Sequence, residues 1–340
     1  EISLDIKNLK NNKRSIKISL ENFGYFFLGN LIFEYLQWVK NETKKRSINN
    51  LLFASREGYF LSKIYKEFFS NKKQNVHYFK SSRFAAHNIS FENKNDIINS
   101  FKKHRFFGSF KDLLKNRFGI NPNKDEKNNN LIINTDRNNN LDKLLQNYIS
   151  LILNNSKKRK KNYLNYLKQL IINGNIAICD ISLFATIQNA LNKVTKYNLT
   201  GFYIPTQSNY IETKNIKFMK LNKSFEKKYF ILESILTAPH GTFLYIDNKL
   251  RFIHEKKMSN QKYFKNREKI IIGVKNYIND IQKLNFVNNI NYKDHYNFGI
   301  INNYLFNQIN NKFFYYDNKI FNSLYFDNKF VRKDENKISI

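Results

Sequence analysis

Residues 50–61 read NLLFASREGYFL, and this stretch decides the fold class. Asn50–Ala54 is mostly apolar and predicts a short buried β-strand. The Ser-Arg-Glu-Gly turn that follows leads into residues 59–69, whose apolar positions have the spacing of an amphipathic helix. A buried strand joined by a short loop to such a helix is the building unit of an α/β protein.

The same order of elements returns further along the chain. Ile176–Cys179 predicts another apolar strand, which ends at Asp180 and a loop of small residues, and Thr186–Val194 predicts the helix after it. Further strands are expected over 76–80 and 200–205, and further helices over 22–40, 141–172 and 225–236. Because strands alternate with helices, we predict a parallel, doubly wound, Rossmann-like α/β sheet.

The chain divides into three expected regions. Residues 1–20 form a polar lead-in, residues 21–258 the α/β catalytic domain, and residues 259–340 a mostly helical C-terminal cap. Within the domain, 93–120 is expected to be helical and basic, and the Asn-rich stretch near 121–140 a polar insertion loop; a β-hairpin is expected around Asp247-Asn248.

The composition is strongly basic. With 58 Lys and Arg against 27 Asp and Glu, the formal net charge is +31. This excess favours a polyanionic partner, a phosphate-rich substrate or an anionic membrane face, but the abundance of Lys, Asn and Ile also fits a general compositional bias. Aromatic and basic residues do not follow the spacing of a nucleic-acid-binding motif, which argues against nucleic-acid readout.

The polarity of the chain predicts a soluble protein. The mean hydropathy is -0.60, and the most apolar stretch, 23–39, is interrupted by Asn30, Glu34 and Gln37. The single Cys179 cannot form an internal disulfide. We expect a cytoplasmic protein, with peripheral contact at the inner membrane left open.

Small residues, Arg and Pro are scarce in this background and gather in a few stretches. We expect the loops that follow strands to bind phosphate, because helix N-termini there offer free N–H groups. The catalytic candidates are Arg56, Glu57, Asp180 and Glu233, with Asp180 also the candidate metal ligand. The candidates for binding substrate or phosphate are Ser55, Gly58, Ser82, Arg83, Ser182, Ala185, Thr186, Gln188, His240 and Gly241.

Each candidate also has a structural interpretation. Arg56 and Glu57 could form a local ion pair, Thr186 could cap its helix, and Arg83 could be an ordinary surface arginine. His240, with Glu233 as its partner in acid–base chemistry, could equally be a structural loop histidine. The sequence contains no GxGxxG, GxxxxGK[ST], HExxH, GxSxG or Asp-x-Asp motif, which argues against the enzyme classes that depend on them.

The order of these stretches resembles a known family. The segments are 50–61, 78–83, 178–188 (ICDISLFATIQ), 201–203 and 232–242 (LESILTAPHGT). Together they resemble the C-terminal module attached to haloacid-dehalogenase-like hydrolases in capsule and O-antigen biosynthesis proteins. That family has approximately aromatic-Asp-Gly-Tyr, Ser-Arg, Asp-Ile-Gly-x-x-Gly-Thr-x-Gln and a late Glu with Pro-x-Gly-Ser. The resemblance covers residues 22–335 and includes Gln188.

The two main loops also resemble the ligand loops of type I phosphoribosyltransferases. That resemblance implies a phosphoribosyltransferase-like sheet, in which Arg56 and Gly58 hold pyrophosphate, Asp180 holds the ribose hydroxyls or Mg²⁺, and Thr186 with nearby amides holds the 5-phosphate. The chain departs from the pattern at four positions, since Glu57 replaces Asp, Ser182 and Ala185 replace glycines, and Ile181 replaces a second acid.

The resemblance implies a transferase of capsule or lipopolysaccharide biosynthesis. It would move 5-phosphoribose from phosphoribosyl pyrophosphate, with Mg²⁺, to a glycan or lipid-linked glycan acceptor, and a haloacid-dehalogenase-like phosphatase would act as partner. The alternatives are a phosphatase-like or nucleotide-sugar-dependent transferase of the same pathway, and a non-catalytic basic docking module.

Overall fold

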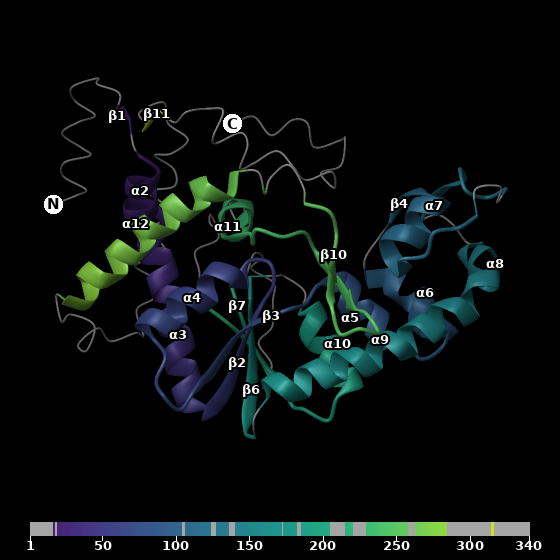
Figure 1. Cartoon of the computed structure of the whole chain (residues 1–340), viewed down its shortest axis with the longest axis horizontal. Coiled ribbons are helices and arrows are strands. Elements are labelled where there is room, and N and C mark those ends of the chain that lie inside the picture. The colour runs from purple at the N-terminus through teal and green to yellow at the C-terminus, as the bar shows by residue number, and fades with distance from the viewer. Residues whose placement is uncertain are drawn as a thin grey trace.

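The computed structural model describes residues 16–17, 19–103, 106–123, 127–135, 140–171, 173–181, 185–204, 215–219, 229–257, 261, 263–283 and 314–315 (Figure 1). The strands are β1 (Ile16–Lys17), β2 (Ile48–Ala54), β3 (Asn75–Phe79), β4 (Phe107–Ser109), β5 (Ile132–Asn134), β6 (Asn175–Asp180), β7 (Thr200–Tyr203), β8 (Ile216–Phe218), β9 (Phe243–Ile246), β10 (Phe252–His254) and β11 (Phe314–Tyr315).

The α-helices are α2 (Leu20–Phe23), α3 (Gly29–Lys45), α4 (Gly58–Phe68), α5 (Arg83–Ser90), α6 (Lys94–Lys103), α7 (Phe110–Leu113), α8 (Leu141–Leu145), α9 (Ile149–Leu170), α10 (Thr186–Val194), α11 (Tyr229–Leu236) and α12 (Phe264–Lys283). Two π-helical turns, η1 (Gly24–Leu28) and η2 (Leu114–Phe118), join α2 to α3 and follow α7, and the 3-10 turn η3 (Gln146–Tyr148) precedes α9.

A five-stranded sheet lies at the centre, in the order β3-β2-β6-β7-β8, with every pairing parallel. Numbered along the chain, this order is 2-1-3-4-5, which is one of the common doubly wound arrangements. The predicted parallel α/β sheet is therefore confirmed. The order reverses between β2 and β6, which are hydrogen-bonded neighbours with Phe53 opposite Cys179.

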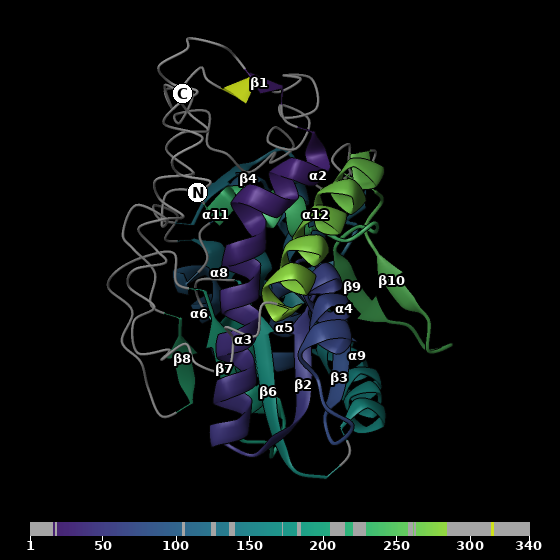
Figure 2. The ribbon, with the colours of Figure 1, turned by 90° about the vertical axis from the view of Figure 1, so that its left-hand side faces the viewer.

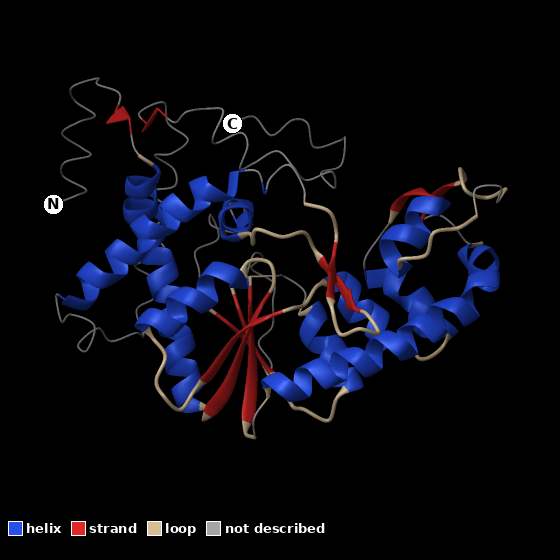
Figure 3. Cartoon of the chain, viewed as in Figure 1, coloured by secondary structure: helices blue, strands red, loops and turns tan. Residues whose placement is uncertain are grey.

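Both faces of the sheet are covered by helices, so β2 is buried along almost its whole length (Figure 3). Its side chains alternate between two cores. Leu51 and Phe53 pack in a core with α3, α4 and α12, whereas Leu52 and Ala54 pack in a core with α5, α9 and α10. The helix after β2 and the helix after β6 thus lie on opposite faces. Doubly wound sheets bind ligands between two such loops, and we call this position at the edge of the sheet the crevice.

The described helix of the C-terminal region, α12, packs directly on the α/β domain. Helix α12 packs against α2, η1 and α3 (Figure 2), and its apolar residues Ile270, Val274 and Ile278 belong to the same core as the sheet. At Gly273 an added Cβ would lie 1.8 Å from the carbonyl oxygen of Glu21, so α12 and α2 approach at backbone distance. The described part of residues 259–340 is therefore a layer of the α/β domain, and its remainder lies outside the described residues, apart from β11, which pairs with β1.

The stretch near 121–140 was predicted to be a polar loop, and this is wrong for residues 132–134. They form β5, which pairs antiparallel with β4, a strand within the stretch expected to be helical. Apolar side chains between Phe91 and Ile152 form a third core that is separate from the two beside the sheet. We call residues 91–153 the insertion unit; it lies at the far end of α9 from the sheet (Figure 1).

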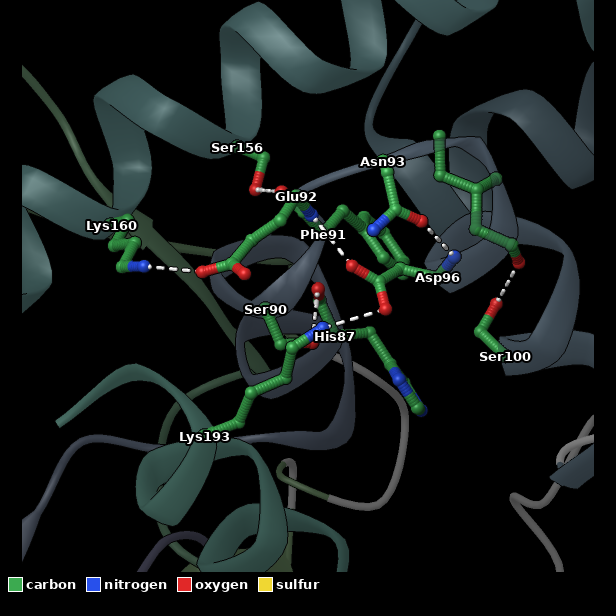
Figure 4. Close-up of polar contacts among 11 residues, drawn as sticks. His87, Ser90, Phe91, Glu92, Asn93, Asp96, Ser100, Ser156, Lys160 and Lys193 are labelled. Carbon is green, nitrogen blue, oxygen red and sulfur yellow. Dashed lines mark hydrogen bonds and ion pairs between the residues drawn. The ribbon is translucent and has the colours of Figure 1, made fainter.

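Polar contacts attach the insertion unit to the α/β core (Figure 4). Glu92 pairs with Lys160 of α9 at 2.8 Å, and Asp96 of α6 pairs with Lys193 of α10 at 2.6 Å. The Ser156 hydroxyl donates a buried hydrogen bond to the carbonyl oxygen of Phe91 at 2.8 Å. The first turn of α6 is thereby fixed against helices of the sheet domain.

No helix within the described part of the chain is both long and apolar enough to cross a membrane.

Candidate functional site

The loops after β2 and β6 meet at the carboxyl edge of the sheet, at the position where the strand order reverses. Asp180 ends β6 one residue beyond the Phe53–Cys179 pair, and therefore lies beside Ala54, just before the Ser55–Gly58 loop. Open α/β sheets bind ligands in the crevice at this kind of position. The structure thus brings Arg56 and Asp180, which are more than 120 residues apart, to one edge of the sheet.

Hydrogen bonds between serines hold the first loop in place. The Ser55 hydroxyl donates to the carbonyl oxygen of Ser81 at 2.6 Å and accepts from the Ser81 amide at 3.1 Å. The Ser55 amide donates to the Ser81 hydroxyl at 3.2 Å. Ser55 therefore ties the loop after β2 to the loop after β3, and its hydroxyl group is occupied in doing so.

Gly58 allows helix α4 to begin close to the sheet. A Cβ at this position would lie 2.6 Å from the carbonyl carbon of Phe53, which is closer than side-chain atoms approach a backbone. Arg56 and Glu57 precede Gly58 and are half-buried, and the Arg56 amide donates to Glu57 Oε2 at 3.0 Å. The start of α4, with Arg56 beside it, is thus directed at the crevice.

Glu233 of α11 shares the electrostatic environment of this loop. Burial is the main cause that raises its pKa to about 7, the negative charge of Glu57 adds to the rise, and Arg56 and Arg83 oppose it. These interactions place Glu233, Glu57, Arg56 and Arg83 within one neighbourhood. A carboxyl group with a pKa near neutrality can either hold or accept a proton under ordinary conditions.

His240 lies at the centre of a polar cluster next to this neighbourhood. Its Nε2 is 2.9 Å from the Tyr78 hydroxyl and 3.1 Å from Lys80 Nζ, and its Nδ1 is 2.8 Å from the carbonyl oxygen of Gly241. The last contact places the proton on Nδ1, so Nε2 accepts from Tyr78 and Lys80. Burial, together with the nearby Lys80, His254 and Arg56 charges, lowers the pKa of His240 to about 4. The ring is therefore neutral at physiological pH.

Several predicted ligand residues have structural roles instead. Ser82 caps α5 by accepting from the Ala85 amide at 3.0 Å and donates to the carbonyl oxygen of Phe243 at 2.6 Å. Gly241 packs against the end of β10, where a Cβ would lie 2.2 Å from the carbonyl oxygen of Glu255. The Ser82 hydroxyl is thus occupied within the fold and Gly241 fills a close backbone contact, whereas Arg83, the first residue of α5, is exposed.

Gln188 is also committed to the fold. Its amide donates to the carbonyl oxygens of Leu199 and Asn215 at 2.7 and 2.8 Å, and its Oε1 accepts from the Tyr203 hydroxyl at 2.8 Å. These contacts join α10 to β7 and β8. The structure does not direct the Gln188 side chain toward the crevice.

The loop after β6 is described only at its two ends. Asp180 and Thr186 are both buried and lie at the end of β6 and the start of α10. Ala185 has a φ of 46°, in the left-handed region that favours glycine. Ser182 lies outside the described residues.

The described residues contain no group of three or more His, Cys, Asp or Glu side chains that could hold a metal ion. Among the described residues, Asp180 therefore belongs to no such group and offers one carboxylate. Such a donor set fits Mg²⁺ only where a substrate supplies most of the oxygen ligands, as the diphosphate of a bound donor does.

Sequence reasoning missed Tyr78, Lys80 and His254. Tyr78 and Lys80 stand at the end of β3 and contact His240 from 160 or more residues away in the chain. The ring centroids of His254 and His240 are 4.5 Å apart. The sequence feature that could have identified Tyr78 and Lys80 as site residues is their position at the carboxyl end of a predicted strand, directly before the Ser-Ser-Arg turn.

No protein-family model matches the chain, and no curated protein matches it in sequence.

Proposed function

We propose that this chain is a glycosyltransferase that moves 5-phosphoribose from phosphoribosyl pyrophosphate to a glycan acceptor. The observation that carries the proposal is that Arg56 follows β2 at the edge where the strand order reverses, and that the charges of Arg56 and Arg83 act on the near-neutral carboxyl of Glu233. In the described part of the chain, neither Arg56 nor Arg83 forms an ion pair. No carboxylate of the described residues pairs with either guanidinium group, and such groups suit bidentate contacts to phosphate oxygens.

The arrangement suits a reaction in which a diphosphate leaves. Arg56, beside the start of α4, and Arg83, at the start of α5, would stabilise the negative charge that develops on departing pyrophosphate. Mg²⁺ bound to the donor would neutralise part of the same charge, with Asp180 as its protein ligand. The ribosyl C1 would develop oxocarbenium character, so most of the catalytic effect is electrostatic.

Glu233 is the residue proposed to take the proton from the acceptor hydroxyl. Its pKa of about 7 means that a substantial fraction is ionised at neutral pH, while the group remains basic enough to accept a proton. Glu57 is proposed to maintain this property, because its negative charge raises the pKa of Glu233.

The resemblance also supports the pathway assignment. The acceptor would be a glycan or lipid-linked glycan of capsule or lipopolysaccharide synthesis. The transferred group retains a 5-phosphate, so a phosphatase of the haloacid-dehalogenase type would be needed to complete the ribosyl residue.

The test is a transfer assay with phosphoribosyl pyrophosphate, Mg²⁺ and a panel of glycan acceptors, in which pyrophosphate release and the phosphoribosylated glycan are both measured. Arg56→Ala should lower kcat/KM about 100-fold or more, since it removes a charge-assisted contact to the leaving group. Arg46→Ala is the matched control, because Arg46 pairs with Glu42 before β2 begins, at the other end of the sheet.

Three outcomes would contradict the proposal. Release of a nucleoside diphosphate from a nucleotide sugar would assign a different donor, and release of inorganic phosphate would assign a phosphatase. Salt-sensitive polyanion binding without turnover, unchanged by Arg56→Ala, would indicate a docking module.

A further inference from the structure

The outer face of the β4–β5 hairpin exposes large apolar side chains. Phe107 is paired with Asn134, and Ile132 is paired with Ser109, so these four side chains lie on one face of the two strands. Phe107 and Ile132 are diagonal neighbours on that face, with 76% and 60% of their surfaces exposed. Ile133 points to the other face and is fully buried in the core of the insertion unit.

The insertion unit forms its buried core without the side chains of Phe107 and Ile132. That unit has a complete core formed by residues such as Phe110, Leu114 and Phe118, all at most 1% exposed. Leu131, which precedes Ile132, is also exposed at 43% and accepts a hydrogen bond from the Phe110 amide. Phe107 and Ile132 thus form an exposed apolar ridge, which we call the hairpin ridge, on a unit that already has a buried core.

Basic side chains accompany the hairpin ridge. Lys111 follows β4 on α7, and its amide donates to the carbonyl oxygen of Asn129, so it lies close to the start of β5. Lys111, Lys115 and Lys127 are exposed, and none of them forms an ion pair in the described part of the chain. Asp112, the acidic residue between Lys111 and Lys115, accepts a hydrogen bond from the Ser109 hydroxyl at its Oδ2 and donates one from its amide to the Ser109 oxygen.

This combination matches one kind of partner. An anionic bilayer offers an apolar layer for aromatic and aliphatic side chains, and negative headgroups for unpaired lysines. Figure 1 and Figure 2 place β4 on the side of the molecule to which the carboxyl ends of the central strands point.

We infer that the hairpin ridge docks the protein on an anionic lipid bilayer, with Phe107 and Ile132 inserted among the headgroups and Lys111, Lys115 and Lys127 facing lipid phosphates. The inference does not depend on the identity of the donor or on catalysis. Membrane docking is then the role of the insertion unit, whereas the α/β domain carries the candidate site.

The test is co-sedimentation of the full chain with vesicles of phosphatidylglycerol and phosphatidylcholine, beside vesicles of phosphatidylcholine alone. The wild-type protein should bind the anionic vesicles, and more weakly as salt rises. The double variant with Phe107→Ser and Ile132→Ser should bind about tenfold or more weakly, because two apolar side chains no longer leave water. Leu250→Ser is the matched control, since Leu250 is exposed at 60% on the β9–β10 hairpin.

A spectroscopic measurement keeps the test independent of stability. Phe107→Trp places an indole on the hairpin ridge, whereas the native Trp38 packs against the core. Brominated lipid should quench the added fluorescence only in anionic vesicles. Absence of quenching, equal binding by the double variant, or a dimer in solution that is lost in the double variant would each overturn the inference.

Discussion

Glu233 is the residue whose proton affinity links the structure most directly to a reaction. Burial beside Glu57 raises its pKa to about 7, against an ordinary value of 4.5. If Glu233 accepts the proton of the acceptor, only its ionised form is active. Transferase activity should then rise with pH through about 7.

Glu233→Gln tests this assignment through the shape of the pH profile. The variant should lose most of the activity, because an amide cannot accept the proton of the acceptor hydroxyl. It should also lose the rise near pH 7, because the glutamine side chain does not ionise in this pH range. Glu57→Gln should move the rise to lower pH, since it removes a charge that raises the Glu233 pKa. An unchanged profile in both variants would exclude Glu233 as the proton acceptor.

Glu34 should make the stability of the protein depend on pH. It lies at 3% exposure on α3, its Oε1 has no hydrogen-bond partner among the residues that the structure describes, and burial raises its pKa to about 8. The folded state therefore retains a proton that the unfolded chain loses above pH 4.5. The free energy of unfolding falls as pH rises through the window between 4.5 and 8.

Glu34→Gln keeps the shape of the side chain without its charge. We expect the variant to exceed the wild type in free energy of unfolding by a few kcal/mol at pH 9, and to equal it at pH 4. Urea denaturation at the two pH values measures both differences. A variant that is less stable at pH 9 would show that the carboxylate is stabilised in the folded state.

At the scale of elements, the junction between β2 and α4 forms the first loop of the site. Gly58→Ala would place a Cβ 2.6 Å from the Phe53 carbonyl carbon, which is backbone and cannot rotate away. The helix must shift, so we expect a loss of about 1–3 kcal/mol in unfolding free energy and weaker donor binding. Lys66→Ala on the exposed side of α4 is the control. Equal stability and donor affinity for wild type and Gly58→Ala would show that the close approach is unnecessary.

Much of the central architecture follows from the sequence because its strands are continuous apolar runs. Asn50–Ala54, Val76–Lys80 and Ile176–Cys179 each match a strand of the sheet to within a few residues. Both faces of that sheet are buried, so neither face needs polar residues and the strands stand out from a polar background.

The elements that the sequence did not predict depend on contacts between distant segments. Phe107–Ser109 and Ile132–Asn134 are only three residues each and pair across the insertion, and β8 is equally short. The meeting of His240 with Tyr78 and Lys80 likewise depends on how the chain folds, which no local pattern contains. Sequence reasoning could thus find the strand-end loops but not the cluster that surrounds them.

At the scale of the whole molecule, the separate cores predict that the insertion unit can lose its structure while the central sheet stays folded. The apolar side chains of residues 91–152 form a core distinct from the two beside the sheet, and α9 connects it to them. Phe110→Ala should remove about 3–5 kcal/mol from the insertion unit, because Phe110 is fully buried there. Hydrogen exchange should then show lost protection over 91–153 while β2 and β6 remain protected. Equal loss in both regions would show a single cooperative unit.

The central claim is that the crevice between β2 and β6 binds the diphosphate of phosphoribosyl pyrophosphate. Isothermal titration calorimetry of the full chain with this compound and Mg²⁺ tests it most directly, beside Arg56→Ala, Asp180→Asn and the control Arg46→Ala. We predict binding with a Kd in the micromolar range that both crevice variants weaken at least tenfold and the control leaves unchanged. No heat with this donor, or equal affinity in all four proteins, would contradict the claim.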